Sequence, residues 1–135
     1  RRPLLVRPTF LPRRLIQIDA RYDAVLAEGF PVVLGGNNET LQLARDVDRT
    51  NWLTLLGICD EAMAADMGDV TMPAKVQCTS GNEYEMTFAE ASWMIRELRA
   101  WGISADANWR RMVKLAKAAR NDDELRAIDL SEGWP

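Results

Sequence analysis

The sequence contains no histidine. This absence removes the commonest general base and the commonest zinc ligand, and it excludes a catalytic triad built on serine or cysteine. There are only two cysteines, Cys59 and Cys78, separated by 18 residues and without C-x-x-C spacing. Two thiols cannot complete a structural zinc site, which needs four ligands. We therefore expect two buried thiols, with a disulfide between them as the less favoured alternative.

Long hydrophobic runs are missing as well. No window approaches the roughly 18 apolar residues that would cross a bilayer. The first apolar cluster, Leu4-Leu5-Val6, is cut short by Arg7 and Pro8, which is not typical of a signal peptide. Neither a phosphate-binding loop nor a G-x-G-x-x-G fingerprint occurs. We expect a soluble protein that is not an enzyme and holds no metal or cofactor. Because the chain begins with Arg1, we also expect the gene product to extend upstream or to be processed.

What is present is the composition of an ordinary globular protein. The chain has 135 residues, of which 47% are apolar and 27% charged, and this length suits one domain. Five tryptophans are a high content for a chain of this length. Tryptophan is common both in cores and in binding surfaces, so this number fits an interaction module.

Charge is distributed unevenly along the chain. The first 14 residues carry five arginines and no acid, whereas the remainder holds 12 basic and 20 acidic residues, a net charge of −8. Three prolines bias this segment to extended conformations. We predict an extended basic arm over residues 1–11 that lies along a neighbouring subunit or folds back over its own acidic body. Its predicted partner-binding residues are Arg1, Arg2, Leu4, Leu5, Val6, Arg7, Phe10 and Leu11.

Hydrophobic periodicity predicts the elements that follow the arm. A helix should run from Pro12 to about Gly29, followed by a β-hairpin of residues 30–34 and 40–44 around a turn at residues 35–38. A second helix should start between Asp48 and Asn51 and end around Gly68. A second hairpin should turn at residues 80–82.

The second half of the sequence predicts one long helix. Thr87 and Glu90 form a capping box, and apolar residues then recur every seven positions to about Arg120. Gly102 lies on the same stripe, so we expect a bend or a close approach there, or else two helices that divide at this residue. A short last helix should cover residues 121–128. The predicted fold is α+β, with three to four helices and two short antiparallel hairpins in a single domain over residues 12–135.

Asp46 and Asp48 open a D-x-D-x-T motif. This pattern is similar to the active-site motif of haloacid-dehalogenase-type phosphatases, in which the first aspartate attacks phosphorus. Those enzymes need a parallel sheet, whereas the strands expected here form antiparallel hairpins. A calcium loop is excluded, because Asn51 and Gly57 stand where that loop needs glycine and glutamate. We favour a helix start capped by the two aspartates and keep a small phosphatase as the minor alternative.

Each of two charge clusters can be interpreted either as solvated surface or as a binding site. A basic run near the end of the long helix could bind nucleic acid, but the overall charge of −3 favours a solvated helix end. An acidic cluster, made of Asp60, Glu61, Asp66 and Asp69, is either a solvated face or a contact for an arginine arm. We expect neither nucleic acid nor membrane as a partner.

Several segments together resemble an uncharacterised bacteriophage domain family found in tail-fibre and tail-fibre-assembly-like proteins. They are residues 18–30, the glycine-centred hairpin, Asn51-Trp52, residues 86–91, and residues 123–135 with the ending Gly133-Trp134-Pro135. The resemblance covers residues 12–135 and contains no catalytic signature. It implies a role in the virion or in tail assembly and implies nothing about the arm.

These observations predict a virion structural protein of a bacteriophage, belonging to the tail, tail fibre or collar. Its expected partners are other virion proteins, with copies of itself among the candidates. Its expected location is the virion, and the host cytoplasm during assembly. The alternative within assembly is a chaperone for fibre folding that leaves the finished particle.

Overall fold

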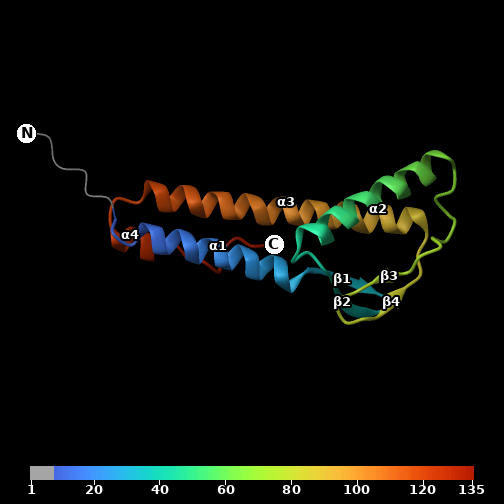
Figure 1. The fold of residues 1–135 in the computed structure, drawn as a ribbon, viewed down its shortest axis with the longest axis horizontal. Coiled ribbons are helices and arrows are strands. Elements are labelled where there is room, and N and C mark those ends of the chain that lie inside the picture. The colour runs from blue at the N-terminus through green and yellow to red at the C-terminus, as the bar shows by residue number, and fades with distance from the viewer. Residues whose placement is uncertain (1–7) are drawn as a thin grey trace, which may run out of the picture. The chain divides into compact units, whose positions relative to one another are not determined.

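A computed structural model of the chain describes residues 8–135 (Figure 1). These residues form four α-helices and two two-stranded antiparallel sheets, which confirms the predicted α+β class. The elements are α1 (Leu11–Glu28), β1 (Phe30–Leu34), β2 (Asn37–Leu41), α2 (Asp46–Ala64), β3 (Val76–Gln77), β4 (Glu83–Tyr84), α3 (Phe88–Ala118) and α4 (Asp122–Arg126). Most of the predicted arm, residues 1–7, lies outside the described residues.

The chain divides into two compact units. Unit 1 comprises the chain up to Val25 together with Ile103–Pro135, and unit 2 comprises Leu26–Gly102. Both α1 and α3 contribute residues to each unit. The single domain expected over residues 12–135 stays a prediction, since two units that share helices can still unfold together.

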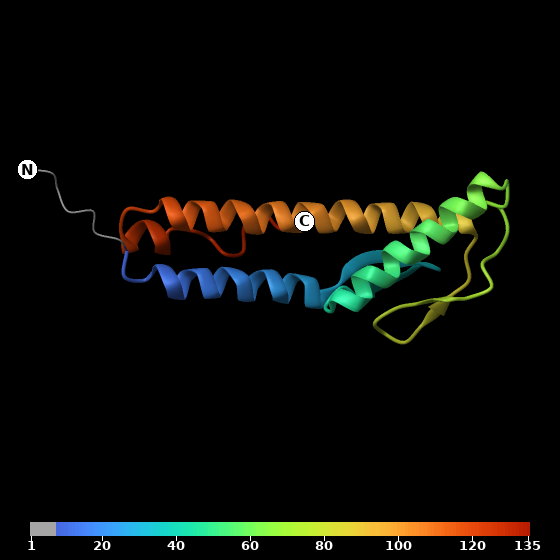
Figure 2. The ribbon, with the colours of Figure 1, turned by 45° about the horizontal axis from the view of Figure 1, so that its top comes forward.

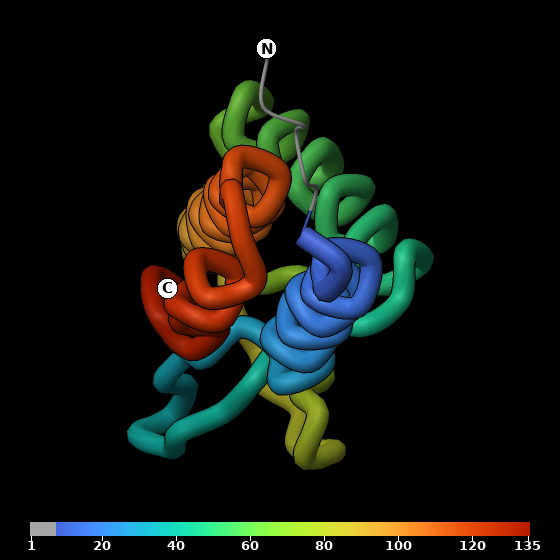
Figure 3. Tube along the Cα trace, turned by 90° about the vertical axis from the view of Figure 1, so that its left-hand side faces the viewer, coloured from blue at the N-terminus to red at the C-terminus, as the bar shows by residue number. Residues whose placement is uncertain are grey.

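In unit 1, most of α1 lies beside the C-terminal half of α3 (Figures 1 and 2). Seen end on, α4 and the C-terminal segment lie next to these two helices (Figure 3). The core of the unit consists of the buried residues Ile18, Met112, Ala116, Leu125 and Ile128. Helical spacing from Met112 to Ala116 aligns apolar side chains in one stripe, and burying that stripe is the main source of helix stability here.

Unit 2 has a core of its own, to which both hairpins, α2 and the N-terminal half of α3 contribute. Its buried residues are Phe30, Leu41, Leu43, Leu56, Cys59, Met72, Val76, Cys78, Met86, Ala91, Met94, Ile95 and Leu98. The two cysteines are free thiols, as the favoured interpretation of the sequence predicted. Burial raises the pKa of Cys59, and burial together with the Glu39 carboxylate raises the pKa of Cys78 to about 11. Both thiols are therefore protonated and poor nucleophiles at neutral pH.

The first hairpin is tighter than predicted. Its turn contains only Gly35 and Gly36, with φ angles of 57° and 79°. Two successive positive φ angles match the twist of the flanking strands, and glycine adopts them without steric cost. The expected four-residue turn and the strand over residues 40–44 are therefore wrong, because β2 begins at Asn37 and ends at Leu41.

Helix α2 starts at Asp46, two residues before the predicted range, and ends at Ala64 rather than near Gly68. Asp48 stabilises the start, because its carboxylate accepts the Arg45 backbone N–H at 3.1 Å. Just beyond the end, Asp66 has a left-handed φ of 56°, which is incompatible with a continuing α-helix.

Helix α3 is continuous from Phe88 to Ala118, so the alternative of two helices divided at Gly102 is wrong. The predicted cap is present at Thr87, whose hydroxyl accepts the Glu90 N–H at 3.1 Å. The second half of the capping box differs, because the Glu90 carboxylate accepts the Thr87 hydroxyl, also at 3.1 Å, instead of its backbone N–H. The expected close approach at Gly102 is also wrong, because a Cβ added there would meet nothing within 4 Å. Helix α4 is shorter than expected and is capped by Asn121 as predicted.

Candidate interaction surface

Strand β1 has one edge that pairs with β2 and one that does not. The register pairs Leu34 with Asn37 directly at the two-residue turn, so Leu34, Val32 and Phe30 exchange hydrogen bonds with β2. By the same alternation, the backbone groups of Pro31 and Val33 point away from β2. Pro31 has no N–H to offer. The unpaired edge of β1 therefore presents two carbonyls and the single N–H of Val33.

The equivalent edge of β2 is already occupied. The Thr40 carbonyl accepts the Thr79 backbone N–H at 2.9 Å, and the two threonine hydroxyls are hydrogen-bonded to each other. This contact agrees with the register, which directs the backbone groups of Thr40 outward. The first hairpin is thus joined to the second on the β2 side, while the β1 side faces α3.

The first turns of α3 present an amphipathic stripe toward β1. Glu90, Trp93 and Glu97 follow one another at intervals of three and four residues, so they lie on one helix face. Trp93 is 69% exposed and Val33 is 65% exposed, the two highest values among the large apolar side chains of unit 2. Exposed large apolar groups that lie next to one another are a candidate interaction surface, whereas single ones are normal.

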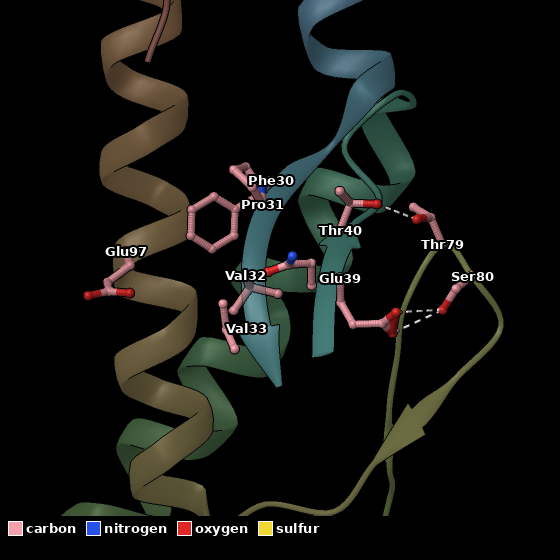
Figure 4. A pocket seen from close by; sticks show the side chains of 10 residues that line it. Phe30, Pro31, Val32, Val33, Glu39, Thr40, Thr79, Ser80 and Glu97 are labelled. Atoms are coloured by element: carbon pink, nitrogen blue, oxygen red, sulfur yellow. Dashed lines mark hydrogen bonds between the residues drawn. The ribbon is translucent and has the colours of Figure 1, made fainter. Parts of the chain in front are cut away.

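These two features enclose a hollow, which we call the β1–α3 groove. Its lining is Val32, Val33, Leu34, Ala89, Glu90, Trp93, Met94 and Glu97. A second hollow continues from it over the first hairpin toward Thr79 and Ser80 and shares Val32, Val33 and Glu97 (Figure 4). Among residues 8–135, no lysine or arginine lines either hollow. The groove therefore combines an apolar centre, acidic flanks and an unpaired strand edge.

Glu39 is a buried carboxylate at the β2 side of this region. The residue is 8% exposed, and its two oxygens accept the Ser80 hydroxyl at 3.0 and 2.9 Å (Figure 4). Its proximity contributes to the raised pKa of Cys78. The hydrogen bonds tie β2 to the turn of the second hairpin, so we assign Glu39 a structural role.

The sequence-predicted arm residues fall into two groups. Arg1, Arg2, Leu4, Leu5, Val6 and Arg7 lie outside the described residues. Phe10 and Leu11, by contrast, pack against the core of unit 1, and Leu11 is the first residue of α1. The Phe10 N–H donates to the Asp122 carboxylate at 3.0 Å, and the Thr9 hydroxyl donates to it at 2.9 Å. Phe10 and Leu11 are therefore engaged within unit 1 instead of being held ready for a partner.

The D-x-D-x-T aspartates are both engaged at the start of α2. Asp48 accepts the Arg45 guanidinium at 2.8 Å, and this hydrogen bond lowers the pKa of Asp48. Asp46 is paired with Arg49. Both described sheets are antiparallel hairpins, so the parallel sheet that the phosphatase interpretation calls for is not found among residues 8–135. The prediction that this motif begins a helix is confirmed.

One residue of the acidic cluster, Asp60, is hydrogen-bonded to other side chains of unit 2. Asp60 accepts the Arg96 guanidinium at 2.9 Å and the Ser92 hydroxyl at 3.0 Å, so it joins α2 to α3. Glu61, Asp66 and Asp69 are exposed. In the basic run at the end of α3, Arg110 is paired with Asp106 at 2.7 Å, and Arg120, just beyond the helix, with Glu124 at 3.2 Å. Both pairs lie on the exposed surface.

Sequence reasoning missed the groove, although one signal for it was available. The buried stripe of α3 runs through Ala91, Ile95 and Leu98, and Trp93 falls on the opposite side. The available signal for the groove was therefore a tryptophan that lies outside the buried apolar stripe of its helix. The contribution of Val33 could not be foreseen, because it depends on which edge of the hairpin remains unpaired.

The described residues contain neither a cluster of metal ligands nor a helix that could span a membrane. Nowhere in residues 8–135 do three cysteine, aspartate or glutamate side chains gather as metal ligands. In the same range, no helix combines the length and the apolar character needed to cross a membrane. The fold and groove define the class of an α+β chain with an exposed apolar groove. Comparisons with family models, with curated proteins and with solved structures give no match.

Proposed function

We propose that the chain is a structural protein of a bacteriophage virion that acts as a protein–protein interaction module, tethered to a neighbouring subunit by its basic arm. It would belong to the tail, tail fibre or collar, and its partners would be other virion proteins. The resemblance to tail-fibre and tail-fibre-assembly-like proteins supports the phage context. The interaction role is supported by the residues themselves.

The observation that carries the proposal is the exposed apolar surface of the β1–α3 groove. Val33 and Trp93 lie in one hollow with more than half of each side chain in water. Burying a large apolar side chain contributes about 1.5–3 kcal/mol, so this surface favours association. A binding surface of this kind needs no catalytic group.

The test is assembly with a truncated arm. We expect a chain lacking residues 1–7 to fold normally but to be lost from the particle, as measured by mass spectrometry of purified virions. The cut must fall before Thr9, because Thr9 and Phe10 bond Asp122 in unit 1. Normal incorporation of the truncated chain would contradict the tether.

The same mass-spectrometric inventory tests the second candidate, a chaperone for tail-fibre assembly. An exposed apolar groove would serve a chaperone equally well, since it could hold a fibre segment before that segment folds. A chaperone would be absent from mature particles of the complete chain but required for infectivity. The phosphatase candidate predicts Mg²⁺-dependent phosphate release that Asp46→Ala abolishes.

A further inference from the structure

We propose that the β1–α3 groove binds the arm of a second copy of this chain, so that the protein assembles by exchange of arms between subunits. This inference rests on the proposed function and names the partner of the tether. The arm segment concerned is Leu4-Leu5-Val6 with its flanking arginines, Arg1, Arg2 and Arg7.

The chemistry of the two surfaces is complementary. The arm carries three arginines and no acid, whereas the groove is flanked by Glu90 and Glu97 and, within the described part of the chain, has no lysine or arginine. The arm has three consecutive apolar residues at its centre, and the groove has Val33 and Trp93 at its centre. Complementary charge steers an encounter and sets its register, while apolar burial supplies most of the affinity.

The backbone geometry fits a short extended segment. Pro3 and Pro8 bracket the arm and favour extended conformations. The unpaired edge of β1 offers the Val33 N–H with the carbonyls of Val33 and Pro31, which matches addition of a strand of about three residues. Pro31 limits the length of that pairing because it lacks a donor. A short pairing anchored by side chains is what a three-residue apolar segment can provide.

The length of α1 favours binding of the arm to the groove of another chain over binding to its own. Helix α1 has 18 residues, and at 1.5 Å per residue it is about 27 Å long. Strand β1 begins at Phe30, beyond the end of α1 at Glu28. Val6 is five residues before Leu11, and five extended residues span at most about 18 Å. Because those five residues are shorter than α1, we assign the arm to the groove of another copy.

Charge reversal in two separate chains tests the exchange. In the arm variant, Arg1, Arg2 and Arg7 are all changed to glutamate. In the groove variant, Glu97→Lys is combined with Glu90→Gln, which keeps the capping box because glutamine also caps. Each variant alone should bring like charges together and lose self-association by about tenfold or more. An equimolar mixture should regain it, because the acidic arm of one chain now meets the basic groove of the other.

Multi-angle light scattering coupled to size exclusion, over a range of protein concentrations, measures the association. Circular dichroism confirms that each variant is folded. The matched control reverses the exposed acids of the alternative acidic cluster, Glu61→Lys with Asp69→Lys, and should associate like the unmodified chain. Val33→Lys alone should lose association, because it places a charge at the apolar centre of the groove.

Four results would overturn the inference. They are a monomeric unmodified chain at all concentrations, a groove variant that associates normally, a mixture that stays monomeric, and loss of association in the Glu61/Asp69 control instead. None of these results bears on whether the chain is present in the virion. An arm that is required for incorporation but does not bind a second copy would leave the proposed function standing with a different partner.

Discussion

Phe10 connects the entry to α1 with the last helix of unit 1. Its ring packs against the unit 1 core and lies within 6.0 Å of the Arg13 guanidinium and 5.6 Å of that of Arg126. We expect Phe10→Ala to lower the free energy of unfolding by about 1–2 kcal/mol, because the ring is only half-buried.

Chemical denaturation measures this loss. The matched control is Ile16→Ala, which removes an apolar side chain that is 68% exposed on α1, the helix that follows Phe10. That change should stay within about 0.5 kcal/mol. Equal losses in the two variants would mean that Phe10 contributes no specific packing.

Asp122 makes the stability of unit 1 depend on pH. The backbone N–H of Phe10 and the hydroxyl of Thr9 stabilise the carboxylate and lower the pKa of Asp122. A lowered pKa in the folded state means that the unfolded chain binds more protons at acidic pH. The stabilisation is therefore complete above the unfolded pKa of about 4 and is lost as pH falls through the lower folded pKa.

We expect Asp122→Asn to reduce the loss of stability at acidic pH. Denaturation curves measured between neutral pH and about pH 2 test this. Asp123→Asn is the matched control, since its neighbouring carboxylate is 95% exposed, and it should retain the profile of the unmodified chain. An unchanged profile for Asp122→Asn would show that other carboxylates dominate the acid response.

At the scale of elements, alanine substitutions at Gly102 and Gly29 should have opposite effects on the stability of the protein. Gly102 lies within α3, and an added Cβ there would meet nothing within 4 Å. Alanine should stabilise the protein by about 0.5–1 kcal/mol through its helix propensity and the reduced freedom of the unfolded chain. Gly29 separates α1 from β1 with a φ of +84°, and a Cβ would lie 2.6 Å from the Leu41 carbonyl oxygen. Alanine there should destabilise the protein.

Thermal unfolding of Gly102→Ala and Gly29→Ala measures the contrast, each variant serving as the control for the other. A melting temperature that falls in Gly102→Ala would indicate that the helix needs flexibility at this residue. A neutral Gly29→Ala would mean that the turn between α1 and β1 can shift by several tenths of an ångström without cost.

Elements with local chemical signals were predictable. The capping box at Thr87 and Glu90 and the seven-residue repeat after it determine one helix, and helix formation depends on neighbours in sequence. The boundaries of β2 and α2 were less predictable. They depend on how few residues a Gly35-Gly36 turn needs and on which of several polar residues takes the capping position.

At the scale of the whole molecule, the shared helices bear on cooperativity. Because α1 and α3 each belong to both units, disrupting one unit removes packing from a helix that the other also uses. We expect a single cooperative unfolding transition. Gly29→Ala, which lies in unit 2, should also lower the protection of unit 1 amides in hydrogen exchange followed by mass spectrometry.

Ile16→Ala provides the control for that experiment, because an exposed change should leave protection unaltered in both units. Loss of protection confined to residues 26–102 in Gly29→Ala would contradict the single-domain prediction. It would then divide the chain into two independently stable parts.

By itself, the sequence determined the absence of histidine chemistry, the α+β class, the long helix, and the contrast between a basic arm and a body of net charge −8. These properties follow from composition and from periodicity between near neighbours in the chain. Only the tertiary structure decided that Phe10 and Leu11 pack against the core of unit 1 and that β1, not β2, keeps an unpaired edge beside Trp93. Pairing and burial join residues far apart in sequence, so local patterns do not contain them.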